Sequence, residues 1–310
     1  MAHHQRIVLG TRGSELALAQ SRMVAEQLKT RWAGLEIETK VINTCGDDPK
    51  LAIADQRAGR KGLFTGEIER ALVDREIDVA VHSAKDLPSH IAAGTDIGAV
   101  LPRAPVEDVL ITMQKEDLES LPPNAMVATG SVRRKHQLYS IRPDLQVVSV
   151  RGNVPTRLRK FAENKWHAII LARAGLERLG YTVWPRGVRM GQGREFYASF
   201  LSPESFLPAG GQGVIAMQIR SCDKELETLL GRVNDPATRV CLRAEREFLR
   251  LLDADCNQPI GVLATTKGTL MKIRAQVFDD SAKVRAASAE GDSQHAEKLA
   301  AELFQKIGRA

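Results

Sequence analysis

Apolar and polar positions alternate along this chain with two different periods, and the succession of these periods predicts an α/β fold. The segment 6–10 carries the short apolar run of a buried strand. Ser14 follows it as an N-cap, ahead of residues whose apolar positions recur at helical spacing. Residues 35–41 then alternate apolar with polar side chains, as a half-buried strand does. The chain therefore begins as strand, helix and strand, the opening of an α/β unit.

The same kind of pattern continues to the other end of the chain. It predicts strands at 77–81, 97–101, 107–113, 126–129, 145–150, 168–171 and 214–219, and helices through 68–72, from Ser131, from about Asn153, and over 222–232 and 237–252. The last part, with strand-like runs at 260–265, 269–278 and 283–289 and a helix at 294–307, is an α+β module of a different kind. Residues 44–62 are typical of a loop, and residues 181–200 are expected to be irregular.

Length and composition favour a multidomain globular protein. A chain of 310 residues is long for one core, so two or three domains are expected, with Pro102 and Pro105 at a crossing point. No apolar run approaches membrane-spanning length, and the first residues lack a secretory signal. The four cysteines form no Cys-x-x-Cys pair, and the histidines lack ligand spacing with them, so no metal site is expected and a reducing cytoplasm fits.

Positive charge is concentrated in one region. The net charge is +6, and residues 131–160 hold eight lysines and arginines against one acid, Asp144. A solvated helix face is one interpretation. However, Arg133, Arg134 and Arg151 follow strand-like runs, where open α/β sheets bind their ligands, and arginine pairs well with carboxylate or phosphate. An anionic ligand is favoured, and nucleic acid is the weaker option because aromatic content is only 5%.

Three further segments carry candidate chemistry. Cys256 stands in a polar turn among Asp, Asn and Pro, which is typical of either an accessible attachment point or a quiet cysteine. The segment 81–88 leaves a buried strand with Lys85 and Asp86, and it predicts either an active-site edge or a surface turn with an Asp cap. Asp86 is then a general acid or an electrostatic stabiliser in the first case, and a cap or one partner of a structural salt bridge in the second. Gly211-Gln212-Gly213 precedes a strand, which excludes a dinucleotide-binding turn and indicates close backbone approach or positive φ.

Several ordered motifs together give the chain a resemblance to a known family. They are Gly10-Thr11-Arg12-Gly13-Ser14, Gly62-Leu63-Phe64, 81–88, Gly130-Ser131-Val132-Arg133-Arg134, Arg151-Gly152-Asn153, Ala174-Gly175-Leu176 to Gly180, Gly211-Gln212-Gly213, and Ala244-Glu245-Arg246 leading to Cys256 and Pro259-Ile260-Gly261. From about Arg6 to the last helix, the chain resembles the porphobilinogen deaminases, also called hydroxymethylbilane synthases. Its departures include Ala254-Asp255 before the cysteine, where the family usually has two glycines.

The resemblance implies a fold of three domains. Two are α/β lobes like those of type II periplasmic binding proteins, the first formed by 1–103 with 213–233 and the second by 106–207. The third, an α+β domain over 236–310, carries the cysteine.

The resemblance also implies a cytoplasmic, monomeric transferase of tetrapyrrole and haem biosynthesis, without nucleic-acid or membrane partners. It joins four porphobilinogen molecules into hydroxymethylbilane on a dipyrromethane cofactor, held by a thioether to Cys256. Asp86 matches the catalytic aspartate. The cofactor positions match Lys85, Ser83, Lys61, Thr129, Ser131, Arg133, Arg134 and Arg157, and the substrate positions match Arg12, Ser14, Arg151 and Arg178. The alternative is a non-catalytic two-lobed binding protein for a small anionic ligand.

Overall fold

The computed structural model describes residues 6–44, 65–184, 187–190, 194–254, 258–279, 281 and 283–309. The chain forms two compact units, which we call unit 1 (Met1–Arg103 with Val214–Cys256) and unit 2 (Ala104–Gly213 with Asn257–Ala310). The chain passes from one unit to the other after Arg103, after Gly213 and after Cys256. The division into three domains stays a prediction.

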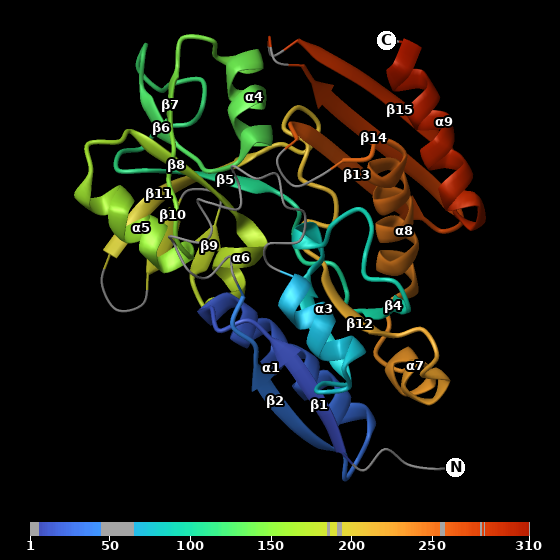
Figure 1. Ribbon diagram of the computed structural model, residues 1–310. Coiled ribbons are helices and arrows are strands. Elements are labelled where there is room, and N and C mark those ends of the chain that lie inside the picture. The colour runs from blue at the N-terminus through green and yellow to red at the C-terminus, as the bar shows by residue number, and fades with distance from the viewer. Residues whose placement is uncertain are drawn as a thin grey trace. The chain divides into compact units, whose positions relative to one another are not determined.

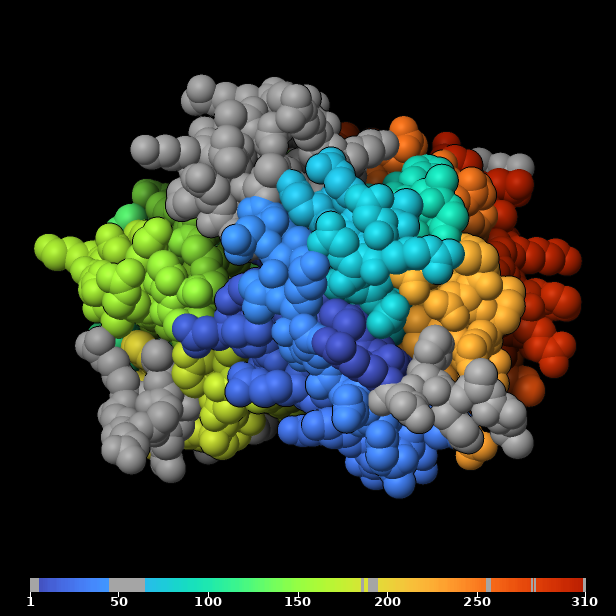
Figure 2. All heavy atoms as spheres, turned by 60° about the horizontal axis from the view of Figure 1, so that its bottom comes forward, coloured from blue at the N-terminus to red at the C-terminus, as the bar shows by residue number. Residues whose placement is uncertain are grey.

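Unit 1 is built on a five-stranded sheet in the order β2-β1-β3-β12-β4. Its elements are β1 (Arg6–Thr11), α1 (Glu15–Arg31), β2 (Glu36–Val41), α3 (Gly66–Val73), β3 (Val79–Ser83), the 3-10 helix η2 (Ala84–Asp86), β4 (Thr95–Val100), β12 (Ile215–Arg220), α7 (Lys224–Gly231) and α8 (Pro236–Leu251). Strands β1, β2 and β3 are parallel, whereas β12 runs antiparallel to both of its neighbours. In Figure 2 the blue start of the chain adjoins the cyan of α3 and the orange of the returning segment.

Local sequence explains how this unit begins. Ser14 is the N-cap of α1, as predicted, and its Oγ accepts a hydrogen bond from the backbone nitrogen of Ala17. The apolar stripe of α1 buries Val24 and Leu28 completely. These side chains belong to one core cluster with Leu9 of β1 and Met217 of β12. The returning strand is therefore part of the same core as the first strand of the chain.

Unit 2 contains two sheets. Its elements are β5 (Asp108–Thr112), β6 (Met126–Ala128), α4 (Val132–Ile141), β7 (Gln146–Val148), α5 (Val154–Glu163), β8 (Ala168–Ala172), α6 (Arg173–Arg178), β9 (Thr182–Trp184), β10 (Gly187–Met190), β11 (Arg194–Leu201), β13 (Ile260–Lys267), β14 (Leu270–Phe278), β15 (Val284–Asp292), the 3-10 helix η3 (Ser293–His295) and α9 (Ala296–Arg309). The larger sheet has the order β7-β6-β8-β5-β11-β10-β9, and β13-β14-β15 form the smaller one.

The larger sheet of unit 2 repeats the plan of the sheet in unit 1. Parallel strands β7, β6 and β8 are followed by β5, which runs antiparallel to β8 and to β11. The antiparallel strand next to the parallel set is β12 in unit 1 and β5 in unit 2, and each directly follows a crossing of the chain between the units. The predicted α/β class, with two lobes of this kind and a C-terminal α+β part, is confirmed.

The prediction that residues 181–200 are irregular is wrong. Strands β9, β10 and β11 pair antiparallel and extend the larger sheet beyond β5. Val188, Phe196 and Ala198 lie in the hydrophobic core of this sheet. Pro185 and three glycines interrupt the alternation of apolar and polar positions, so the strands become evident only through their pairing with one another and through the pairing of β11 with β5.

The smaller sheet packs against α9, as Figure 1 shows for the red end of the chain. It also contacts α4, where Gln137 Nε2 donates to Gln276 Oε1 at 2.9 Å, and the segment 203–208 of the same unit. The backbone nitrogen of Val262 donates to the carbonyl oxygen of Pro208 at 3.0 Å. A side chain at Gly261 would meet Leu207 Cβ at 2.8 Å, which explains why glycine stands there. None of the helices in the described ranges is long and apolar enough to cross a membrane.

Candidate active site

The carboxyl end of β3 places the predicted catalytic carboxylate at the edge of the sheet in unit 1. The strand ends at Ser83, and η2 carries Lys85 and Asp86 directly after it. Both side chains are half-buried. Among the described residues, none forms a hydrogen bond or an ion pair with the Asp86 carboxylate. Lys85 and Asp86, which both lie in the described range 65–184, therefore do not form a salt bridge with each other.

A small pocket of about 60 Å³ opens beside Asp86. Its lining consists of Arg12, Ser14, Leu16, Ala17, Gln20, Thr65, Val81, His82, Ser83 and Asp86. The predicted substrate positions Arg12 and Ser14 thus share one pocket with the predicted cofactor position Ser83 and with Asp86. Thr65 Oγ1 is buried and has no hydrogen-bond partner within the described ranges, so the pocket offers a spare hydroxyl group.

Two buried side chains on neighbouring elements hold the end of β3. Gln20 of α1 is 2% exposed, and its Nε2 lies 2.8 Å from Ser83 Oγ. On the adjacent residue, His82 Nε2 lies 3.0 Å from Gln218 Oε1. Gln218 Nε2 donates to Glu69 Oε1 at 2.8 Å and to Thr95 Oγ1 at 2.7 Å. Because that amide nitrogen faces two acceptors, its oxygen faces His82, which must donate from Nε2.

The surroundings of His82 favour the neutral form of its ring. Burial lowers its pKa to about 4, and the positive charges of Arg246 and Arg12 act in the same direction. The hydrogen bond to Gln218 opposes this effect without overcoming it. No sequence signal pointed to Gln20, Thr65 or Gln218, because none of them belongs to a recognisable motif.

In unit 2 the corresponding edge carries hydroxyl groups at the start of α4. Ser131 is the N-cap of this helix, as predicted, and its Oγ accepts from the backbone nitrogen of Arg134. Its own backbone nitrogen donates to Thr129 Oγ1 at 3.2 Å. A Cβ at Gly130 would come within 2.6 Å of the carbonyl oxygen of Val150, so only glycine allows the chain to pass here. The predicted cofactor positions Thr129 and Ser131 are thereby brought together.

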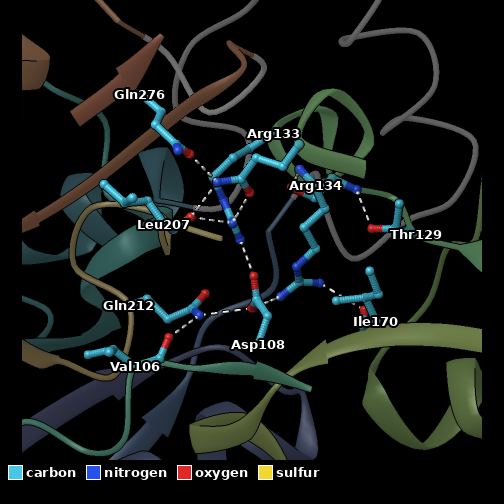
Figure 3. A network of polar contacts seen from close by, with 11 residues as sticks. Val106, Asp108, Thr129, Arg133, Arg134, Ile170, Leu207, Gln212 and Gln276 are labelled. Atoms are coloured by element: carbon cyan, nitrogen blue, oxygen red, sulfur yellow. Dashed lines mark hydrogen bonds and ion pairs between the residues drawn. The ribbon is translucent and has the colours of Figure 1, made fainter. Parts of the chain in front are cut away.

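Arg133 and Arg134 are 4% and 5% exposed, so the interpretation of this region as a solvated helix face is wrong for them. Both donate to one carboxylate, Asp108, at 2.7 Å each (Figure 3). Burial by itself raises the pKa of the Asp108 carboxyl, but the two guanidinium groups outweigh burial and hold this pKa well below its usual range. Asp108 carries no signal in the sequence, because an acid at the start of a strand has no special pattern.

The remaining predicted arginines lie on loops and helices of the same unit. Arg151 is exposed, and Arg157 Nε donates to the carbonyl oxygen of Gly152 at 2.7 Å. Arg178 of α6 donates from Nη2 to the carbonyl oxygen of Gly213 at 2.6 Å. Burial lowers the pKa of Arg178 to about 10, and its Nε has no partner in the described parts of the chain. Gly211 and Gly213 have φ values of 75° and 84°, which confirms the predicted need for glycine in that turn.

Two predicted site residues, Lys61 and Cys256, lie outside the described residues.

Helix α8, which leads toward Cys256, belongs to unit 1 and is attached there by side chains. Glu245 is fully buried and pairs with Arg103, which lies just before the crossing between the units, at 2.6 Å. Arg246 donates to the carbonyl oxygen of Pro88, two residues beyond Asp86, at 3.1 Å.

The chemistry of these groups suits an acidic ring compound with N–H groups. A ligand of this type needs a carboxylate to accept from its ring nitrogens, and cations and hydroxyl groups to bind its acids. Unit 1 offers Asp86 with Arg12, Ser14 and the spare hydroxyl of Thr65 in one pocket. Unit 2 offers hydroxyl groups at the start of α4 and the buried Nε of Arg178. The donor and acceptor groups present therefore fit a dipyrromethane with carboxylate side chains.

The fold and these groups define an α/β protein of two units equipped for an anionic ligand. The chain matches the family model "Porphobilinogen deaminase, dipyromethane cofactor binding domain" over residues 7–228 and "Porphobilinogen deaminase, C-terminal domain" over residues 239–308. This chain belongs to the porphobilinogen deaminase family.

Individual relatives agree with the family models. The porphobilinogen deaminase of Syntrophobacter fumaroxidans is 40% identical over 302 residues, which is 97% of this chain and 94% of that protein. The porphobilinogen deaminase of Thermus thermophilus is 40% identical over 303 residues, covering 97% and 95%. Among solved structures, the methionine-binding protein MetQ is 10% identical with a TM-score of 0.43, covering 76% of this chain and 93% of that one.

Proposed function

We propose that this chain is a hydroxymethylbilane synthase, a transferase of tetrapyrrole and haem biosynthesis. It joins four porphobilinogen molecules head to tail into linear hydroxymethylbilane. Each condensation breaks the carbon–nitrogen bond of an aminomethyl group, forms a carbon–carbon bond between two rings and releases one ammonia. One water molecule supplies the hydroxyl group of the released product. The match to both family models carries this proposal. The two models span residues 7–228 and 239–308, and the candidate site residues lie within these ranges.

Asp86 is the catalytic residue in this proposal. When the bond to the departing ammonia breaks, positive charge remains on the substrate's ring. A fixed carboxylate stabilises this charge and can move a proton at the ring nitrogen. Two observations support the assignment. Asp86 lines one pocket with Arg12, and no described residue forms a hydrogen bond or an ion pair with its carboxylate.

The cationic and hydroxyl side chains bind and orient acidic groups. We assign the acetate and propionate groups of the substrate to Arg12, Ser14, Arg151 and Arg178. We assign the cofactor's acidic groups to Lys85, Ser83, Lys61, Thr129, Ser131, Arg133, Arg134 and Arg157. The shared pocket of Arg12, Ser14 and Ser83 and the contact between Thr129 and Ser131 support these assignments. Guanidinium groups suit them because they form paired hydrogen bonds with carboxylates.

The cofactor is a dipyrromethane bound through a thioether to Cys256. When bound, it supplies the free ring position to which the first substrate ring is joined. Of the two cysteines in the described ranges, Cys241 is buried in α8 and Cys222 is exposed, and neither matches the family's cofactor position. The polar turn around Cys256 fits an attachment point on the grounds of sequence.

One experiment tests this function against the alternative of a non-catalytic binding protein. The purified chain is measured by intact mass and is then incubated with porphobilinogen while ammonia and hydroxymethylbilane are quantified. We expect an adduct of two pyrrole units and the release of four ammonia molecules for each hydroxymethylbilane. An unmodified chain that binds porphobilinogen and releases no ammonia contradicts the enzyme and favours the binding protein.

Three further properties are part of the proposal. We expect a monomer in the cytoplasm that acts on a small molecule and has neither a nucleic-acid nor a membrane partner. The arrangement of cysteines supports a reducing compartment. Sedimentation of the purified chain tests the monomer, and titration with duplex DNA at two salt concentrations tests the absence of nucleic-acid binding.

A further inference from the structure

Asp108 is the first residue of β5, and it nevertheless lies at the ligand-binding edge of its sheet. Ligands of open α/β sheets bind at the carboxyl ends of the parallel strands. Because β5 runs antiparallel to β8, Asp108 pairs with Ala172, the last residue of β8. It is 1% exposed. A buried carboxylate therefore lies at the edge where Thr129 follows β6 and where α6 begins after β8.

The Asp108 carboxylate accepts three hydrogen bonds from side chains (Figure 3). Its Oδ1 accepts from Arg134 Nη2 at 2.7 Å and from Gln212 Nε2 at 2.9 Å. Its Oδ2 accepts from Arg133 Nη2 at 2.7 Å. The carboxylate thus contacts both predicted cofactor arginines and the turn between the two positive-φ glycines.

Each of these partners leads to another part of the unit. Arg133 Nη1 donates to the carbonyl oxygen of Leu207 at 2.6 Å, and Arg134 Nη1 donates to that of Ile170 at 2.9 Å. Gln212 Nε2 also donates to the carbonyl oxygen of Val106 at 2.7 Å. One residue after Gln212, the carbonyl oxygen of Gly213 accepts from Arg178. Asp108 therefore connects the start of α4 with the turn that contacts Arg178.

The arginine pair depends on this carboxylate. Two guanidinium groups share one acid, so the three side chains together retain positive charge in a buried place. Without Asp108 the two like charges would face each other with little water to screen them, and they would have to move apart. Their Nε atoms have no partner within the described ranges, so no other hydrogen bond there fixes the angle of either guanidinium plane at that atom.

We propose that Asp108 is a positioning residue for the cofactor and substrate arginines: it fixes Arg133 and Arg134 directly, and Arg178 through Gln212 and Gly213. The inference rests on the proposed function, since the arginines matter only if acidic rings bind there. Asp108 does not contact those rings itself. Its role is to place the guanidinium groups before the cofactor arrives, which lowers the cost of ordering them on binding.

The test compares four proteins that are prepared without cofactor and then supplied with hydroxymethylbilane. They are the wild type, Asp108→Asn, Gln212→Leu, and Asp144→Asn as a control. Asp144 forms a two-bond ion pair with Arg142 in the same unit and contacts none of the proposed cofactor positions. The thiol displaces water from the hydroxymethyl group of the added compound, so intact mass gives the rate at which a four-ring adduct forms. Thermal unfolding gives the melting temperature before and after loading.

A positioning role changes how the cofactor binds, whereas a purely structural role changes stability alone. We expect Asp108→Asn to load about 10²-fold more slowly than the wild type, the scale of a misplaced binding group, and to lose most of the gain in melting temperature on loading. Gln212→Leu should show the same effects to a smaller degree. Asp144→Asn should lower both melting temperatures equally and load at the wild-type rate.

The possible outcomes are distinct. Loading of Asp108→Asn at the wild-type rate, with an unchanged gain in melting temperature, overturns the positioning role even if the variant is less stable. If Asp108→Asn does not fold, Gln212→Leu decides in the same way, because it leaves both ion pairs in place. A wild type that never acquires the adduct refutes the proposed function, and this inference with it.

Discussion

Replacing Asp86 by Asn separates a catalytic role of this side chain from a role in stability. Asn keeps the size of the side chain and an acceptor oxygen, but it carries no charge and cannot move a proton. We expect Asp86→Asn to fold, to retain a cofactor supplied as hydroxymethylbilane, and to lose most of its turnover. A loss of about 10²–10⁴-fold is the scale of a general acid–base group.

The structure sets the expected change in stability. Asp86 is half-buried, and no described residue forms a hydrogen bond or an ion pair with its carboxylate. The substitution therefore breaks no contact in that part of the chain, and the change in unfolding free energy should stay within about 0.5 kcal/mol. If a salt bridge with Lys85 were present, a partly exposed pair of this kind would contribute at most about 1 kcal/mol.

The assay measures single-turnover rate and melting temperature on the same preparation. Asp96→Asn is a suitable control, because Asp96 is an exposed aspartate of β4 that lines no part of the pocket. It should retain both the wild-type rate and the wild-type melting temperature. A near-wild-type rate for loaded Asp86→Asn would falsify the catalytic assignment, and a fall in melting temperature with an unchanged rate would make Asp86 a structural residue.

Three further predictions concern the thiol, the arginine pair and the buried histidine. Cys256→Ala should fold and carry no pyrrole adduct, and an intact adduct in the mass spectrum would exclude Cys256 as the attachment point. Arg134→Leu should lose about 3 kcal/mol of stability in denaturant unfolding, because Asp108 keeps Arg133 but loses its second buried partner. Cofactor loading should fall as well. Normal stability and normal loading of this variant would contradict both roles of Arg134. The pKa of His82 falls from 6.5 to about 4 on folding. Between these pH values the unfolded chain binds a proton at His82 that the folded chain does not bind. The free energy of unfolding should therefore rise with pH across this range, by up to about 3 kcal/mol, and stay level above it. Unfolding curves of His82→Gln at several pH values should lack this contribution, and a pH dependence equal to that of the wild type would show that His82 is not buried in its neutral form.

Much of the fold follows from short-range features of the sequence. Helical and strand periods predicted the alternation of elements, and Ser14, Ser131 and Asn153 begin their helices as expected because N-capping depends on only three or four neighbouring residues. Asp86 was expected at a strand end for the same reason, since an apolar run followed by polar residues marks the place where a buried strand stops.

The partners of the site residues depended on tertiary structure. Asp108 meets Arg133 and Arg134 only because β5 enters its sheet antiparallel, and strand direction is not encoded in the period of a single strand. The sequence predicted arginines that bind a carboxylate but could not show that one of those carboxylates belongs to the chain itself. Strands β9 to β11 are a similar case, because their pairing with one another and the pairing of β11 with β5 stabilise segments whose local pattern is broken by proline and glycine. Local patterns thus determined where the elements begin and end, while pairing across the sheet decided which side chains face one another.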